Sequence, residues 1–444
     1  MQPPAITPEE KFDQRISTWL TTEGKTFASG ELAAAYQRRG QRILDAIRLK
    51  QPDRVPNIFL GGGCMVTYGG ATLADTFYNG EKTRQAALKF MEDFRPEYFV
   101  IPPGIALGGV LDMLGYKVYR WPGGNLPDNI PFQYVEGEYM TAAEYDQLIN
   151  NPEGFLLRTY LPRAFEKLGA LKQIPNLFHV IEITGVSMLL GPLSQPPLRD
   201  AINTLLQAAD MLKTATGTII STTGEIIRRW GMPAVLGGVS FAPFDIISDT
   251  LRGTQGALMD MYRCPDKLLA AIDVVTPISI DLATSMSFPG SPPFIFIPLH
   301  KGADSFMSNA QFTRFYWPSF KTMLLGIIEA GLIPVPFVEG SYNNRLDIIA
   351  DAGLPAGKTL WLFDRTDMLA AKNKLGGWAC IGGNVPGSLF ATGTAEQMEH
   401  YCRDLIETVG AGGGFCLAPG VGLEHAKPEN IRAFIESTNK YGVL

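Results

Sequence analysis

Short apolar runs that alternate with longer helical patterns constrain the fold of this chain more than any other feature of its sequence. Strands that are apolar along their whole length, with helices between them, indicate a parallel sheet covered by helices. Nine runs have this character: VPNIFL (55–60), EYFVIP (97–102), HVIEIT (179–184), PAVLGGVSF (233–241), PFIFIPL (293–299), LIPVPFV (332–338), KTLWLF (358–363), WACIGG (378–383) and GGFCLAP (413–419). An eight-stranded α/β barrel uses eight of them, so we assign the run at 179–184 to an insertion.

Helical patterns fill the intervals between these runs. They lie at 83–94, 197–229, 265–285, 309–330, 366–375, 395–409 and 428–440. Residues 1–50 are charged and helical in pattern, and we expect them to form an N-terminal helical extension. Residues 51–444 are then predicted to form a TIM-like (β/α)8 barrel with an elaborated loop insertion at about 118–190. A length of 444 residues fits one large barrel with insertions.

The charge distribution and the cysteines exclude several classes of protein. The net charge is −6 and no block of lysine and arginine occurs, so nucleic acid is not an expected partner. No uninterrupted apolar stretch reaches about 18 residues, and the first residues, MQPPAITPEEKFDQ, lack the basic and apolar regions of a signal peptide. Five scattered cysteines without a C-x-x-C motif fit reduced thiols. We therefore expect a cytoplasmic protein that does not enter a membrane.

The stretch LIPVPFVEG (332–340) ends an apolar strand on a carboxylate, Glu339. A charge at such a place is costly unless it has a partner or a chemical role. Active sites of α/β barrels lie at the carboxyl ends of the strands, so Glu339 is a candidate general acid if burial raises its pKa. Two alternatives stay open: an ion pair with Arg345, and a metal site that Glu339 shares with His300 and Asp364.

Two further strand ends carry residues that suit catalysis. His300 follows PFIFIPL and could carry a proton at neutral pH, although a histidine at a strand end often only bonds the backbone. Asp364 follows KTLWLF and is the third catalytic candidate, with a helix N-cap as its alternative. The residues predicted to contact substrate or cofactor are Tyr68, Cys64, Lys301, Arg345, Asn384 and His425. For Cys64 the competing interpretation is a small buried thiol.

Three stretches in the last third of the chain resemble the uroporphyrinogen decarboxylase superfamily, which includes that decarboxylase and the corrinoid-linked methyltransferases. They are FMSNAQFTRFYWPSFK (306–321), IGGNVPGSLFATGTAEQM (381–398) and CLAPGVGLEHAKPENIRAF (416–434), and the stretches at 38–56 and 248–268 add weaker support. The resemblance implies a TIM-like barrel, which in this superfamily is often paired with a second copy.

The sequence departs from the patterns of both branches. In the thiol-directed methyltransferases, the resemblance implies zinc ligands at the positions that hold Phe337, Glu339 and Val421 here. Phenylalanine and valine cannot bind zinc, so we do not expect a zinc-activated thiolate. The decarboxylase's aspartate would fall in IPPG (101–104) and its arginine pair near 59–68, and both are missing. A tetrapyrrole with many carboxylates would need that cationic lining.

The resemblance and the strand-end acid together predict a methyltransferase of a corrinoid-dependent system. It would move a methyl group between a small O- or N-methyl compound, or tetrahydrofolate, and a separate corrinoid protein, because no D-x-H-x-x-G cobalamin signature occurs in the chain. Zinc stays an alternative cofactor, with Glu339 and His300 as ligands. The alternative activity is a decarboxylase or lyase that acts on a non-porphyrin carboxylic acid held by Lys301 and Arg345, and a third is a non-catalytic binding barrel. The base rate for soluble enzymes favours a homodimer.

Overall fold

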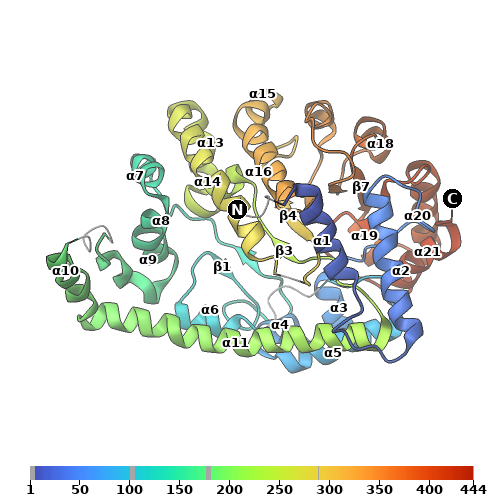
Figure 1. Cartoon of the computed structure of the whole chain (residues 1–444), viewed down its shortest axis with the longest axis horizontal. Helices are drawn as coiled ribbons and strands as arrows, with labels where there is room; N and C mark the ends of the chain where they lie inside the picture. Colours follow the sequence, from blue (N-terminus) through green and yellow to red (C-terminus); the bar gives the residue numbers. More distant parts are fainter. Residues whose placement is uncertain (1–5, 101–105, 177–181, 289, 444) are drawn as a thin grey trace.

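A six-stranded parallel sheet forms the centre of the structure (Figure 1). The computed structural model describes residues 6–100, 106–176, 182–288 and 290–443. The strands follow chain order across the sheet, and every neighbouring pair is parallel. They are β3 (Gly238–Val239), β4 (Phe294–Leu299), β5 (Ile333–Val338), β6 (Leu360–Phe363), β7 (Cys380–Val385) and β8 (Phe415–Pro419). The α/β class and the parallel sheet predicted from the apolar runs are thus confirmed.

The run at 55–60 and the described part of the run at 97–102, residues 97–100, extend the sheet at its two edges through single bridges. Residues 101 and 102 lie outside the described residues. Asn57 pairs with β8, and Phe99 pairs with Ala234 ahead of β3. Both segments were predicted as full strands, but in the described residues each makes only this one bridge. Pro56 explains part of the difference, because proline has no N–H to donate to a ladder.

The predicted helices form close to their predicted limits. They are α5 (Gly80–Phe94), α11 (Pro196–Trp230), α14 (Pro265–Ser285), α15 (Asn309–Gln311) with η6 (Phe312–Tyr316) and α16 (Trp317–Glu329), α18 (Met368–Leu375), α20 (Ala395–Val409) and α21 (Pro428–Tyr441). The run at 179–184 does not join the sheet in its described part, because α10 (Ile183–Leu193) begins within it. Residues 179–181 lie outside the described residues.

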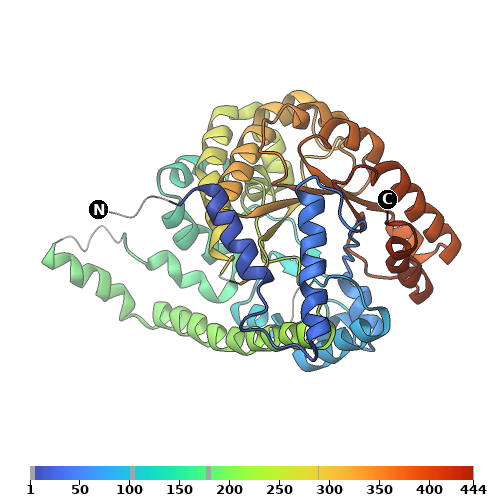
Figure 2. The same ribbon diagram turned by 45° about the vertical axis from the view of Figure 1, so that its right-hand side comes forward.

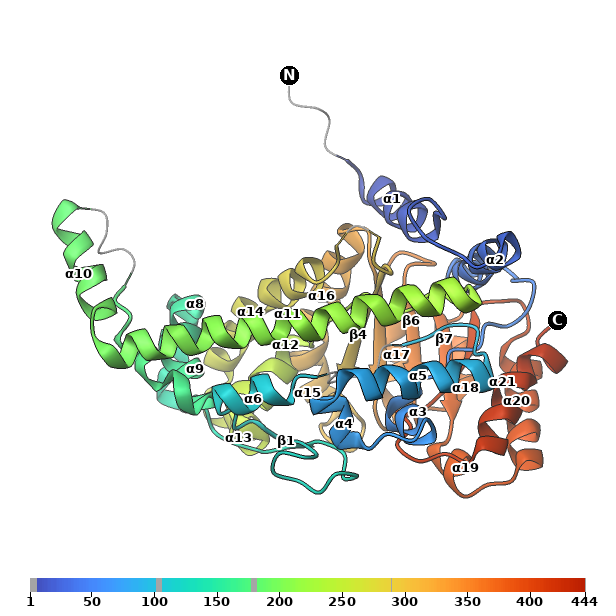
Figure 3. The ribbon, with the colours of Figure 1, turned by 90° about the horizontal axis from the view of Figure 1, so that it is seen from below.

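Shorter helices occupy the strand-to-helix connections and the region before α11. These are α3 (Gly62–Tyr68), α4 (Leu73–Tyr78), α6 (Gly108–Leu114), α7 (Tyr145–Asn150), α8 (Pro152–Phe155), α9 (Leu161–Ala164), α12 (Pro243–Asp245), η5 (Ile246–Leu251), α13 (Gly253–Arg263), α17 (Leu346–Ala350) and α19 (Gly387–Ala391). A small hairpin of β1 (Tyr119–Arg120) and β2 (Gln133–Tyr134) precedes α7. The hairpin, α7, α8 and α9 lie in the region of about 118–190 where the insertion was predicted, and so does the start of α10, which projects at one end of the molecule in Figures 1 and 3.

Two N-terminal helices, α1 (Pro8–Leu20) and α2 (Gly30–Ile47), pack against the amino ends of the strands (Figure 2). Phe12 and Trp19 of α1 share one core cluster with Phe294 and Ile333, the first residues of β4 and β5. The Trp19 and Phe294 rings meet edge to face at 5.3 Å. The amino end of the sheet is therefore covered, whereas the carboxyl end carries the loops.

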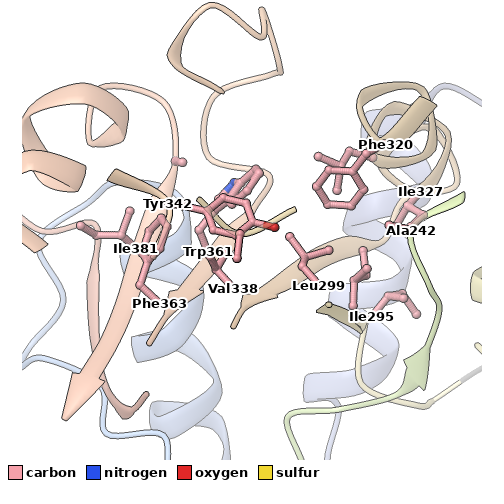
Figure 4. Packing of buried hydrophobic residues seen from close by; sticks show 14 of the residues in the cluster. Ala242, Ile295, Leu299, Phe320, Ile327, Val338, Tyr342, Trp361, Phe363 and Ile381 are labelled. Carbon is pink, nitrogen blue, oxygen red and sulfur yellow. The ribbon is translucent and has the colours of Figure 1, made fainter. Parts of the chain in front are cut away.

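The strands are apolar on both faces, as expected for a sheet buried on both sides. In β6, Leu360 and Leu362 belong to the cluster that contains α1 and α2, whereas Trp361 and Phe363 belong to the cluster under the outer helices. Figure 4 shows Trp361 and Phe363 beside Val338 in this second cluster. Side chains of a strand alternate between its faces, so one strand fills two cores.

Helix α14 is, among the described residues, the one helix that is long and apolar enough to cross a membrane by length and composition. It behaves as a core helix in this structure. Leu268, Ile272, Val275 and Ser279 form a buried stripe at helical spacing, and the helix packs against α16. Asp273, on the opposite side, is exposed.

Candidate active site

Two aspartates, a histidine and a lysine form a cluster at the carboxyl ends of β3 and β4. His300 follows β4, and its Nδ1 lies 2.6 Å from an Asp249 carboxylate oxygen. The Lys301 ammonium lies 3.1 Å from the other Asp249 oxygen. Asp245, which is only 1% exposed, accepts the backbone N–H groups of His300 and Lys301 at 3.0 and 3.1 Å. The segment after β3 therefore fixes the residues that follow β4.

His300 is held in its protonated form. Burial lowers its pKa, but the hydrogen bond to Asp249 and the charges of nearby carboxylates outweigh burial and raise the pKa to about 9. At neutral pH the ring is therefore an imidazolium that donates from Nδ1 to Asp249. Nε2 forms no hydrogen bond with a described residue, so it is available as a proton donor to a ligand.

The carboxyl group of Asp245 also retains a proton near neutral pH. Complete burial and the charge of Asp249 raise its pKa to about 7, although His300 favours the ionised form. The Tyr316 hydroxyl donates to Asp245 over 2.9 Å and also favours the carboxylate. Because Asp245 and His300 attract each other when both are charged, they titrate as a pair.

Glu339 stands at the end of β5, next to β4 in the sheet, and its side chain is exposed. The surrounding protein removes part of its hydration and raises its pKa, while the charge of His300 lowers it and that of Asp364 raises it. Solvent reaches the carboxyl group and limits the rise. No described side chain donates a hydrogen bond to it. The raised pKa that a general acid at this strand end would need is thus present, although the surface is open, and the role of Glu339 as a general acid stays a prediction.

Asp364, at the end of β6, supports the turn that carries Glu339. Its carboxylate accepts the Gly340 N–H over 3.1 Å, and Arg365 lies 3.6 Å away. Burial raises the pKa of Asp364, against the lowering effect of the Gly340 N–H. The helix N-cap is Asp367, whose side chain accepts from Ala370. Asp364 therefore positions the Glu339 turn, and its role as a catalytic group stays a prediction.

Arg345 does not pair with Glu339, which corrects one alternative drawn from the sequence. The side chain is 1% exposed and donates to the carbonyl groups of Gly302 and Ala303 at 3.2 and 3.3 Å. It also donates to the Met307 carbonyl and to Asn309. The carbon atom of its guanidinium group lies 4.8 Å from the centre of the Phe312 ring. With its donors used in this way and almost no free surface, Arg345 holds the loop after β4 and has no side to offer a substrate.

Cys64 and Tyr68 were predicted to contact substrate or cofactor. Both lie in α3, and each forms a hydrogen bond with a group of the protein. The Cys64 thiol is 2% exposed and donates to the Gly61 carbonyl over 2.8 Å. Burial and the charge of Glu424 raise its pKa to about 12, so it is a neutral core thiol. The Tyr68 hydroxyl donates to Asp93 on α5 over 2.9 Å. Both side chains therefore serve the packing of α3.

Asn384 and His425 complete the predicted set. The Asn384 amide donates to the Thr366 carbonyl over 2.9 Å and accepts from the Tyr401 hydroxyl over 3.0 Å. These bonds hold the end of β7, so the loop-holding interpretation fits better than ligand contact. His425, in the loop after β8, is exposed beside Glu424 and is free to meet a ligand.

Comparison with known proteins assigns the family of this site. The model of the uroporphyrinogen decarboxylase (URO-D) family matches residues 133–441, more than half of the chain. The chain belongs to the URO-D family. The resemblance seen in the sequence is thereby confirmed, although the weaker stretch at 38–56 lies outside the matched range. A search of curated protein sequences finds no match.

A solved methyltransferase from Methanosarcina mazei has a similar structure to this URO-D protein. The TM-score is 0.58 at 17% sequence identity, and the similarity covers 92% of this chain and 98% of the archaeal one. At 17% identity this structural similarity establishes a shared fold. Because the coverage is nearly complete, the region ahead of residue 133 shares in that fold.

The donor set of this URO-D protein does not fit the zinc site implied by the resemblance. Phe337 and Val421 occupy two ligand positions and have no donor atom, which leaves Glu339 alone. With the Nε2 atom of His300 added, the site offers only two ligands, whereas a zinc site needs at least three from the protein. In the described part of the chain, no group of three or more His, Cys, Asp and Glu side chains is placed to hold a metal ion. We therefore derive no catalytic step through zinc.

Asp245 and Asp249 are the site residues that the sequence prediction missed as a pair. Neither residue was among the catalytic or ligand-contact residues predicted from the sequence. They stand four residues apart on the turns of α12 and η5, so both reach the loop after β4. The spacing D-x-x-x-D after an apolar run was the available signal, but many surface helices contain it.

The His300–Asp249 bond predicts a specific titration. The His300 ring should titrate at about 9, and Asp249→Asn should bring its pKa down toward the ordinary value of about 6.5, because asparagine carries no negative charge to stabilise the imidazolium. NMR of the ring protons measures this, and the chain has only four histidines. In the folded wild-type protein the raised pKa stabilises the fold fully below about pH 6.5, and this contribution is lost as pH rises through about 9. An unchanged His300 titration in Asp249→Asn would show that the bond is not formed in solution.

Proposed function

We propose that this protein is a methyltransferase of a corrinoid-dependent system. It moves a methyl group between a small O- or N-methyl compound, or tetrahydrofolate, and a corrinoid protein. One observation carries the proposal: an imidazolium, His300, and an exposed carboxyl group of raised pKa, Glu339, stand on the ends of neighbouring strands. Membership of the URO-D family and the shared fold with the Methanosarcina methyltransferase support it.

Supply of a proton is the contribution of this chain to the reaction. When the carbon–oxygen bond of a methyl ether breaks, its electron pair passes to the oxygen, and a reduced corrinoid supplies the nucleophile that accepts the methyl group. Glu339 donates a proton to the leaving oxygen, so that a neutral alcohol departs. His300, kept protonated by Asp249, stands beside Glu339 as a proton reserve. For an N-methyl compound the same proton passes to nitrogen.

The proposal includes a closed (β/α)8 barrel whose carboxyl end meets the corrinoid protein. The bridges of Asn57 to β8 and of Phe99 to Ala234 support closure through the two N-terminal segments. Close approach of a flat cofactor is supported by the loop after β8. Gly422 there is exposed, and no atom lies within 4 Å of the place where its Cβ would stand.

A carboxy-lyase that acts on a small acid is the second candidate, because the matched family model describes a decarboxylase. It would need cationic groups around the substrate. Lys301 is paired with Asp249 at 3.1 Å, and Arg345 is turned into the loop after β4. Both of the cationic groups that the sequence offered for a carboxylate are thus engaged within the chain, and this favours methyl transfer.

A spectroscopic assay tests the proposal. The purified protein is mixed with chemically reduced cob(I)alamin and a panel of methoxylated and N-methylated donors, methyl-tetrahydrofolate included. Growth of the methylcobalamin spectrum with one donor is the expected result, and it names the substrate. Release of carbon dioxide from a panel of carboxylic acids is measured in parallel. Carbon dioxide release without any methylcobalamin would replace the proposal with the lyase.

A further inference from the structure

Five tyrosines gather beside the candidate active site, and the proposed reaction uses none of them. They come from β1, from β2, from the segments that flank this hairpin, and from η2 (Leu156–Tyr160). Each of the five side chains is partly exposed. We call this set the tyrosine cluster: Tyr116, Tyr119, Tyr134, Tyr139 and Tyr160.

The tyrosine cluster is attached to η5, the segment that carries Asp249. The Tyr134 hydroxyl donates to the Asp249 carbonyl. The backbone N–H of Tyr139 donates to the Leu251 carbonyl over 2.9 Å. Asp249 in turn accepts a hydrogen bond from His300. The cluster and the candidate active site therefore share one support.

The rings of the cluster meet at steep angles. The Tyr119 and Tyr134 rings lie 5.6 Å apart with 69° between their planes, and Tyr139 and Tyr160 lie 6.0 Å apart at 75°. Phe132 adds a further ring at 62° to Tyr119. Burial raises the pKa of Tyr160, and Tyr139 and both members of the other ring pair add to the rise. The hydroxyl ends of the four rings therefore lie near one another.

This arrangement suits a rounded ligand better than a flat one. A flat ring compound stacks best between parallel rings. The near-parallel rings of the cluster are already stacked on each other, since Tyr116 lies 4.7 Å from Phe165 and 6.1 Å from Tyr119, with 25° between the planes in both pairs. Rings at steep angles instead cover a rounded group from several sides.

The charges around the cluster favour a cation. Burial and then the charge of Asp249 raise the pKa of Tyr119. The same two causes raise the pKa of Tyr134, and the charge of Glu136 adds to them. The face of an aromatic ring is itself the negative part of its quadrupole. A cation is attracted by the acids and by the ring faces, whereas an anion is repelled by both.

We propose that the tyrosine cluster binds a methylated ammonium ion, held against the ring faces by cation–π attraction. The methyl groups of such an ion spread its charge over a rounded apolar surface, which the steeply angled rings cover. A primary ammonium ion or a guanidinium group would need hydrogen-bond acceptors in addition, and a methylated ion does not. The inference rests on the rings and the charges alone, so it does not depend on methyl transfer.

A pair of ligands with the same shape tests the role of charge. Choline carries a trimethylammonium group, and 3,3-dimethyl-1-butanol has the same shape without the charge. Each is titrated into the full-length protein and followed by isothermal titration calorimetry. Choline should bind with a Kd of about 1 mM or below. The neutral compound should bind at least about tenfold more weakly, because it gains no cation–π attraction.

Substitutions of one ring test the place of binding. Tyr119→Leu should weaken choline binding at least about tenfold, because it removes the ring that contacts most of the others. Tyr119→Phe should keep the affinity within about threefold of wild type, since the ring remains and its hydroxyl bonds no described residue. Tyr262→Leu, at a tyrosine of α13 that is 76% exposed and lies outside the cluster, should leave the affinity unchanged. If circular dichroism shows that Tyr119→Leu is unfolded, Tyr160→Leu carries the same expectation.

Four results would overturn the proposal. Absence of choline binding up to about 50 mM rejects a cation site. Equal binding of the neutral compound shows that shape and not charge is recognised. Unchanged affinity in a folded Tyr119→Leu variant places the cation elsewhere. An equal loss in Tyr119→Phe and Tyr119→Leu would assign the binding to the hydroxyl group rather than to the ring face.

Discussion

Replacement of Glu339 by glutamine should lower the rate of methyl transfer to cob(I)alamin by about 10²- to 10⁴-fold, the usual contribution of a general acid. Glutamine keeps the size of the side chain and removes the proton that the leaving oxygen needs. The carboxyl group bonds no described residue, so the fold should not depend on it. Thermal unfolding of the variant should match that of wild type within the error of the measurement.

A matched control separates the loss of this acid from the loss of any carboxyl group near the carboxyl ends of the strands. Glu424, after β8, is partly buried, and burial raises its pKa, as the surrounding protein raises that of Glu339. Glu424→Gln should retain methyl transfer within about threefold of wild type, because the proposed mechanism gives it no proton to transfer. If Glu339→Gln turns over as fast as wild type, Glu339 has no place in the mechanism.

Arg345→Met should lower the free energy of unfolding by about 4 kcal/mol, the second large effect that we expect. The side chain donates to three carbonyl groups and to Asn309, and each bond contributes about 1 kcal/mol. Methionine fills much of the volume but leaves buried acceptors at Gly302 and Met307 unpaired. Urea denaturation followed by circular dichroism measures the change.

Arg365→Met is the control for this effect. The Arg365 side chain is 81% exposed and lies 3.6 Å from Asp364, so its loss should cost less than about 1 kcal/mol. If Arg345→Met unfolds at the same urea concentration as wild type but loses activity, the substrate-binding role drawn from the sequence would be restored. A loss of stability that also lowers activity supports the loop-holding role.

The sequence predicted the elements well because the signals for them are local. The helix at 265–285 was placed at its observed limits, since proline begins it and one apolar stripe runs through it. The strand ahead of Glu339 was recognisable from LIPVPFV, which can only be buried. Strands 55–60 and 97–102 were predicted in the right place, but their reduction to single bridges depends on neighbours that are distant in the chain.

The candidate site was less predictable, because side-chain direction and partners are tertiary properties. His300 and Glu339 were found through their places at strand ends, where the fold puts functional groups. Asp249 lies in a helical turn, and only the approach of β4 to that turn brings its carboxylate to His300. Cys64 was a candidate contact residue with a small buried thiol as its alternative, and the structure agrees with the buried thiol.

The sequence by itself determined the order of strands and helices, the α/β class and the family. It also indicated the strand ends at which to look for functional groups. These features depend on periodicity and short motifs, which are local properties of the sequence. Only the tertiary structure decided which charges meet. It paired His300 with Asp249, turned Arg345 into a loop and left Glu339 open to solvent. The physical reason is that the pKa and the free surface of a side chain depend on groups within a few ångströms, and in a parallel sheet those groups come from strands that lie far apart in the chain.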